Sequence, residues 1–176
     1  SIGITLFDVN NVKPENYLRD ADTAMYRAKA LGGNRHQLFD SAMYTSAVAL
    51  LELEGELRHA VEHQEWLVEY QPIISMTDNK MLGVEALVRW QHPQRGLLMP
   101  DSFVPQAESS GLIDDLGSWV MREAFRQWRV WANEGIDGLT MAVNVSAMEF
   151  GRASFIPRLR LALDDTEADP DWIELE

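Results

Sequence analysis

The sequence predicts an α/β fold built from parallel strand–helix units. From residue 65 onward, short runs rich in β-branched and aromatic residues alternate with longer runs whose apolar residues recur every three or four positions. Such alternation is typical of a parallel sheet covered by helices. With 46% hydrophobic residues and 6 Trp among 176 residues, the chain can bury a core.

The first forty residues predict a strand, a helix and a second strand. "SIGITLF" is predicted as a strand, "NNVK" as a turn and "PENYLRDADTAMYRAKALGG" as a helix that starts at Pro14 and ends at Gly32–Gly33. "HQLFD" then predicts a short strand. The apolar positions of the helix, at helical spacing, are Leu18, Ala21, Met25 and Ala28.

Residues 41–64 predict a single connecting helix. The helix carries an apolar stripe made of Leu50, Leu53, Leu57 and Val61. This stripe indicates that the helix transmits signals between domains or forms contacts in a homodimer. The same helix carries "HAVEH", His59 to His63, which matches a short zinc-peptidase pattern. A metallopeptidase is the weaker interpretation, because the pattern is short and lies on a connector rather than in a cleft.

The remaining residues predict two hairpin-like strands, "WLVEYQPIIS" and "MLGVEALVRW", and then a short helix in "MPDSFVPQAESSGL". A long helix, "LGSWVMREAFRQWRVWANEG", a strand, "LTMAVNVS", a helix, "SFIPRLRLALDD", and a strand, "WIELE", follow. The tryptophans of the long helix have helical spacing, which favours core packing over base stacking. Since no helix follows the last strand, we expect the chain to be a fragment of a larger α/β domain.

The stretch "GVEALVRWQHP" places charges inside an apolar strand. Alternation puts Val84 and Val88 on one face and Glu85 and Arg89 on the other. A single charged residue in a predicted strand usually faces solvent, and a buried one must be paired or bind a metal. The face that carries Glu85 and Arg89 is therefore either exposed to solvent or part of a functional site.

Two later strands place oxygen side chains in an equivalent position. Asn144 lies opposite the apolar face of "MAVNVS", and Glu176 does so in "WIELE". Because ligands bind at the C-terminal ends of parallel strands, we expect Glu85, Asn144 and Glu176 to form an oxygen-rich site suited to Mg²⁺ or Mn²⁺. Arg89 beside it can hold a phosphate, which indicates metal-assisted phosphoester hydrolysis.

The composition excludes several classes of protein. A formal net charge of -13 excludes a general binder of polymeric nucleic acid, since such binders need a basic face. The absence of cysteine excludes disulfides and thiolate metal sites. The sequence contains no run of about 18 apolar residues, so it predicts no membrane span in these residues. We expect a cytoplasmic location, with any tether to the inner membrane lying in segments outside these residues.

From about Leu57 to Glu176, the sequence resembles the EAL family of cyclic-di-GMP phosphodiesterases. The matching stretches are "YQPIIS", "GVEALVRWQHPQRGLLMPDSFVPQAESSGLI", "LGSWVMREA", "AVNVSAMEF" and "IELE". The resemblance implies part of a TIM-like (β/α) barrel with a two-metal site. It also implies hydrolysis of cyclic di-GMP to linear pGpG, or, as the alternative, an inactive module that binds cyclic di-GMP or a protein partner as a receptor.

The resemblance also assigns roles to residues. It implies that Glu85 is a catalytic metal ligand, that Asn144 and Glu176 are further ligands, and that Arg89 contacts phosphate. Two more positions are implied to line the dinucleotide pocket: Gln71 and Leu87. The family's remaining ligands and its catalytic lysine are not in this chain, so we expect the 176 residues alone to be inactive.

Residues 1–40 resemble the C-terminal tail of a GGDEF domain, through "SIGITLF" and "ADTAMYRAKALGGNRHQLFD". Lys29 matches a phosphate-contacting lysine of that family, although the signature segment is absent. The predicted layout is a GGDEF remnant at 1–40, a connector helix at 41–64 and the N-terminal part of an EAL domain at 65–176. A homodimer formed through the EAL domain or the connector is expected.

Overall fold

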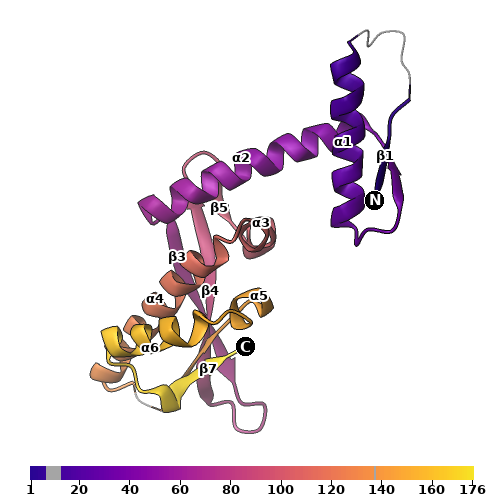
Figure 1. Cartoon of the computed structure of the whole chain (residues 1–176). Helices are drawn as coiled ribbons and strands as arrows, with labels where there is room; N and C mark the ends of the chain where they lie inside the picture. The colour runs from indigo at the N-terminus through magenta and orange to yellow at the C-terminus, as the bar shows by residue number, and fades with distance from the viewer. Residues whose placement is uncertain (7–12, 137) are drawn as a thin grey trace. The chain divides into compact units, whose positions relative to one another are not determined.

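The computed structural model describes residues 1–6, 13–136 and 138–176, which form two compact units, Ser1–Leu53 and Glu54–Glu176 (Figure 1). The boundary falls inside helix α2 (Ser41–His63). The predicted turn "NNVK" and the end of the first predicted strand lie largely outside the described residues. Among the helices of the described ranges, none combines the length and the apolar character that a membrane span needs.

The first unit contains the predicted strand, helix and strand. β1 (Ile2–Ile4) and β2 (His36–Leu38) pair in parallel, and α1 (Pro14–Ala30) connects them. A side chain at Gly3 would place its Cβ 1.8 Å from the carbonyl oxygen of Ala21, so β1 lies directly against the helix backbone. Glycine at this position is what permits the contact.

The predicted apolar face of α1 is partly wrong. Leu18 is 74% exposed, whereas Ala24 and Ala28 are fully buried. The strand at Gly3 lies closest to the backbone of Ala21 and Met25. The end of the helix is as predicted, since Gly32 has a φ of 95° and Gly33 has a φ of 68°.

Helix α2 has the predicted extent, but its leucine stripe is only partly buried. Leu57 is 1% exposed, whereas Leu50 is 50% exposed. The buried positions of α2 lie in the second unit, where Glu56 forms an ion pair with Arg95 at 2.8 Å.

The second unit is built on one five-stranded sheet. Its strands are β3 (Trp66–Ile74), β4 (Met81–His92), β5 (Gly96–Leu98), β6 (Thr140–Val143) and β7 (Ile173–Leu175). The order is β3-β4-β6-β7, with β5 paired to β4. β3 and β4 are antiparallel, as the predicted hairpin requires, and β4, β6 and β7 are mutually parallel. The parallel strand–helix units are therefore confirmed.

Helices connect these strands. They are the 3₁₀ helix η1 (Pro100–Ser102), α3 (Val104–Ser110), α4 (Ile113–Asn133), α5 (Ala147–Phe150), α6 (Phe155–Thr166) and the 3₁₀ helix η2 (Pro170–Trp172). Three of them were predicted: α3, α4 and α6. α4 contacts the sheet and α6 packs against α4 (Figure 1). Trp128 of α4 is buried and donates its indole N–H to the carbonyl of Leu139 at 2.9 Å. Within the predicted tryptophan stripe, Trp128 therefore belongs to the core, as predicted, whereas Trp119 and Trp131 are half-buried.

The helix-facing side of β4 is the apolar one. Val84, Ala86 and Trp90 are all buried, and the Trp90 ring packs against Trp66 and Phe103 with centroids 5.2 Å and 5.7 Å away. Glu85, Leu87 and Arg89 alternate with these residues, so they project from the opposite face of the sheet.

Candidate functional site

The pairing of the strands gathers the predicted site residues on one face of the sheet. Gln71 of β3 lies opposite Glu85 of β4, and Glu85 is paired in turn with Ala142 of β6. Ala142 pairs with Glu174 of β7. Residues directly paired across strands project to the same face, and every second residue along each strand does so as well. Gln71, Glu85 and Glu174 thus share a face.

Asn144 and Glu176 lie beside each other just past the ends of their strands. The backbone N–H of Glu176 donates to the carbonyl of Val143 at 3.0 Å, and the N–H of Val145 donates to the carbonyl of Glu176 at 2.8 Å. This pair of bonds continues the parallel ladder and makes Glu176 the register partner of Asn144. Both side chains therefore leave the sheet on the face that carries Glu85.

The side chains of Asn144 and Glu85 are in direct contact. The amide nitrogen Nδ2 of Asn144 donates to Oε1 of Glu85 at 2.6 Å. Asn144 is exposed and Glu85 is half-buried, so both polar groups remain open to a ligand. Glu85, Asn144 and Glu176 thus supply two carboxylates and one amide from three neighbouring strands.

Arg89 lies on the same face but is engaged with another residue. Its Nε donates to Oε2 of Glu69 at 2.9 Å, and its Nη1 donates to the carbonyl of Val88 at 2.9 Å. Only 11% of the Arg89 side chain is exposed. Four residues along a strand span roughly 13 Å, so Arg89 is not adjacent to Glu85. The pairing with Glu69 was not predicted from the sequence.

A cavity of about 380 Å³ opens beside Glu85 and Asn144. Its wall is mostly apolar and comes from β4, α3, α4 and the segment that follows β6. Besides Glu85, two further carboxylates line it, Glu108 of α3 and Glu149 of α5. Sequence reasoning missed both, because neither lies on a predicted strand and each meets its partner on a different element: Glu108 meets Ser146, 38 residues away, and Glu149 meets Arg158 of α6.

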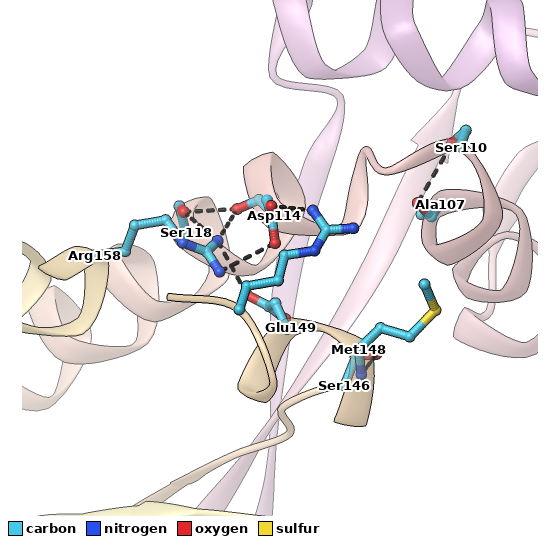
Figure 2. A network of polar contacts seen from close by, with 9 residues as sticks. Ala107, Ser110, Asp114, Ser118, Ser146, Met148, Glu149 and Arg158 are labelled. Atoms are coloured by element: carbon cyan, nitrogen blue, oxygen red, sulfur yellow. Dashed lines mark hydrogen bonds and ion pairs between the residues drawn. The ribbon is translucent and has the colours of Figure 1, made fainter. Parts of the chain in front are cut away.

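Glu149 is a buried carboxylate held in a network of charges. It is 2% exposed, and its Oε1 lies 3.2 Å from Nη1 of Arg158 in α6. Burial raises the pKa of Glu149, as does the nearby Asp114 carboxylate, whereas Arg158 opposes the shift. Figure 2 shows Arg158 reaching from α6 to Asp114 and Ser118 at the start of α4. The network therefore joins α4, α5 and α6.

The donor set at Glu85, Asn144 and Glu176 fits a hard divalent cation, because carboxylate and amide oxygens are the ligands that Mg²⁺ and Mn²⁺ prefer. Within residues 1–6, 13–136 and 138–176, no group of three or more His, Cys, Asp or Glu side chains is arranged to hold a metal. Glu85, Asn144 and Glu176 do not form such a group, because only two of the three are carboxylates and the third is an amide.

The alternative zinc pattern at His59–His63 gains no support. The two rings stack on each other with centroids 3.8 Å apart, and Nδ1 of His59 faces Oε1 of Glu65 at 3.1 Å. These residues belong to no metal-ligating group in the described part of the chain.

Residues 54–176 match the family model described as the EAL domain. The chain is 40% identical over all of its 176 residues to the bifunctional diguanylate cyclase/cyclic di-GMP phosphodiesterase MucR of Pseudomonas aeruginosa, covering 26% of that protein. It is 38% identical over its whole length to the cyclic di-GMP phosphodiesterase NbdA of the same organism, covering 22% of it. The chain thus spans about a quarter of these relatives.

Solved structures show the same likeness. The P. aeruginosa MucR phosphodiesterase in complex with cyclic di-GMP superimposes with a TM-score of 0.68 and 41% sequence identity. The match covers 70% of this chain and 50% of that one. This likeness confirms the predicted fold class, a mixed α/β fold of the EAL type.

Proposed function

Because this chain belongs to the EAL domain family, we propose that it forms part of the active site of a metal-dependent phosphodiesterase that hydrolyses cyclic di-GMP to linear pGpG. EAL phosphodiesterases generally depend on divalent metal ions. The observation that carries the proposal is the contact of Asn144 with Glu85, 2.6 Å across neighbouring parallel strands within the matched region. The activity belongs to a protein in which this chain is joined to the rest of the barrel.

Glu85, Asn144 and Glu176 are the proposed ligands for Mg²⁺ or Mn²⁺, and Glu85 is the proposed catalytic residue among them. When bound, the metal would polarise the phosphate and lower the pKa of the attacking water. The chain itself fixes the position of the donors: β4 holds Glu85, the end of β6 holds Asn144, and the ladder from β6 to β7 holds Glu176. Such preorganisation supports electrostatic stabilisation of the transition state.

Gln71, Leu87 and Arg89 are the proposed contacts for cyclic di-GMP. Gln71 is the cross-strand partner of Glu85, and Leu87 lies two residues beyond Glu85 on the same face and lines the cavity. The guanidinium of Arg89 has five N–H donors, and its bonds to Glu69 and Val88 use two of them. While it is bonded to Glu69, Arg89 stays on the face of the sheet that carries Glu85, where we propose that the substrate binds.

We propose further that residues 1–40 are a remnant of a GGDEF domain, that 41–64 form a connector helix and that 65–176 begin the EAL domain. The alignment with MucR supports this layout, since it includes residues 1–40 and that protein's name joins a diguanylate cyclase to a phosphodiesterase. A homodimer formed through the EAL domain or the connector helix is part of the same proposal.

The test uses the complete EAL protein that contains residues 1–176. It is incubated with cyclic di-GMP and either Mg²⁺ or Mn²⁺, and pGpG is quantified by chromatography while binding is measured separately by calorimetry. Metal-dependent pGpG supports the phosphodiesterase. Tight binding with no product would overturn it in favour of a receptor.

A further inference from the structure

The segment between β6 and α5 contains the proposed ligand Asn144. Two residues later, Ser146 is the N-cap of α5. The hydroxyl of Ser146 caps α5, because it accepts a hydrogen bond from the backbone N–H of Met148 at 3.3 Å. It also donates a hydrogen bond to Oε1 of Glu108. Both hydrogen-bonding functions of one hydroxyl are thus engaged, one within the turn and one across to α3.

Glu108 comes from a different part of the fold. It lies on α3, 38 residues before Ser146 in the sequence, and both side chains are half-buried at the wall of the cavity. A carboxylate–hydroxyl hydrogen bond in a partly desolvated site is stronger than one between neutral groups. The bond therefore fixes the end of the Asn144 segment relative to α3.

The other end of α5 is held by a separate set of contacts. The carboxylate of Glu149 lies against Gly117 of α4, where a Cβ would meet Oε1 at 2.1 Å. Glu149 also forms the ion pair with Arg158, which is bound in turn to Asp114 (Figure 2). Three sets of contacts therefore hold the segment around Asn144: the backbone ladder from Val143 and Val145 to Glu176, the contacts of Glu149, and the bond from Ser146 to Glu108, which ties the start of α5 to α3.

We propose that Glu108 is a positioning residue, which acts through Ser146 to hold the Asn144 amide against Glu85. The inference rests on the proposed function, because it takes Asn144 as a metal ligand. Residues that orient metal ligands typically change metal affinity or activity by about 10–100-fold when they are removed. Glu108 itself contacts neither Asn144 nor Glu85 in any hydrogen bond of the described residues, so its effect must pass through Ser146.

The test compares Glu108→Ala, Glu108→Gln, Ser146→Ala and the double variant Glu108→Ala/Ser146→Ala in the complete EAL protein. Mn²⁺ affinity is measured by titration without substrate, alongside kcat and KM for cyclic di-GMP and the thermal midpoint. Ser109→Ala is the matched control, since Ser109 neighbours Glu108 on α3 and its exposed hydroxyl donates within the same helix, to the carbonyl of Gln106.

We expect Glu108→Ala and Ser146→Ala each to weaken Mn²⁺ binding about tenfold, and the double variant to be no weaker than the worse single variant. Glu108→Gln should keep most of the affinity, because its amide oxygen still accepts from Ser146. Ser109→Ala should match the wild type.

Additive losses in the double variant would overturn the proposal, as would a lowered thermal midpoint in Glu108→Ala with unchanged Mn²⁺ affinity. Wild-type protein that binds Mn²⁺ without producing pGpG would refute the proposed hydrolysis, while the Mn²⁺ comparison would still decide the role of Glu108. Wild-type protein that binds no Mn²⁺ would overturn both.

Discussion

The amide nitrogen of Asn144 lies 2.6 Å from Oε1 of Glu85, although 59 residues separate them in the sequence. The contact arises because β4 and β6 are neighbouring parallel strands in fixed register, with Glu85 paired to Ala142. Asn144 then extends two residues further on the same face. The alignment of these two strands is thus sufficient to bring the Asn144 and Glu85 side chains together.

Removal of the metal should weaken the binding of cyclic di-GMP. Glu85 and Glu176 share a face with Glu174, and a bare set of carboxylates repels a ligand with two phosphates. We expect the affinity measured by calorimetry to fall when a chelator is added and to recover with excess Mn²⁺. Equal affinity with and without metal would contradict this account of the site.

Arg89→Lys should raise KM with little change in kcat. Arg89 donates through Nε to Glu69 and through Nη1 to Val88, and a lysine ammonium cannot reproduce both bonds and also hold a phosphate. Losing one charged hydrogen bond to substrate corresponds to a rise of about 10-fold or more in KM. Steady-state kinetics test this, with Arg122→Lys on α4 as the control. An unchanged KM would place Arg89 outside the substrate site.

Gly117→Ala should destabilise the protein. The new Cβ would lie 2.1 Å from Oε1 of Glu149, and that carboxylate is held by Arg158. Overpacking of this kind lowers the free energy of unfolding by about 1–3 kcal/mol. Chemical denaturation measures the loss. Adding Glu149→Ala to Gly117→Ala should recover part of it.

Gly55→Ala is the matched control for that substitution. Gly55 lies inside α2, and nothing lies within 4 Å of a Cβ placed there. Replacing a glycine in a helix interior by alanine raises stability by roughly 0.5–1 kcal/mol. If both alanine substitutions had the same effect, the close contact between Gly117 and Glu149 would be refuted.

Glu149→Gln should gain stability relative to the wild type as the pH rises. Burial raises the pKa of Glu149 above its ordinary 4.5, so the folded state holds the proton more tightly than the unfolded state. The stability that this proton provides is complete below pH 4.5 and is lost as the pH rises through the raised pKa. Glutamine resembles the protonated form and does not lose it.

Denaturation of wild type and Glu149→Gln at a series of pH values from 4 to 8 tests this. The difference in the free energy of unfolding should move in favour of the variant with increasing pH. A difference that is constant, or that moves toward the wild type, would mean that the ion pair with Arg158 outweighs burial.

The strand faces could be predicted from the sequence because side chains alternate along a strand regardless of what covers it. Glu85, Asn144 and Glu176 were placed on one face by this rule, and the observed register agrees with it. The rule gives no information on distances along the face. For that reason it did not anticipate that Arg89 would bind Glu69 rather than lie beside Glu85.

Two short elements, α5 and β5, and the long-range pairs could not be predicted. α5 has 4 residues and β5 has 3, which is too few to display a period. Glu108 lies on a predicted helix and Glu149 lies in no predicted element, and nothing in the sequence pairs them with Ser146 and Arg158, which come from other elements. Helical spacing alone likewise did not reveal that Leu18 would be exposed while Ala24 and Ala28 are buried.

The most direct test of the central claim is a comparison of pGpG production by the wild type and by Glu85→Ala in the complete EAL protein with Mn²⁺. Glu62→Ala, at an exposed position on α2, is the control. Since even partners outside the metal's own ligands affect activity by about 10–100-fold, the loss of Glu85 should lower turnover on the order of 100-fold or more, with the control unchanged. Full activity in Glu85→Ala would contradict the assignment of the site.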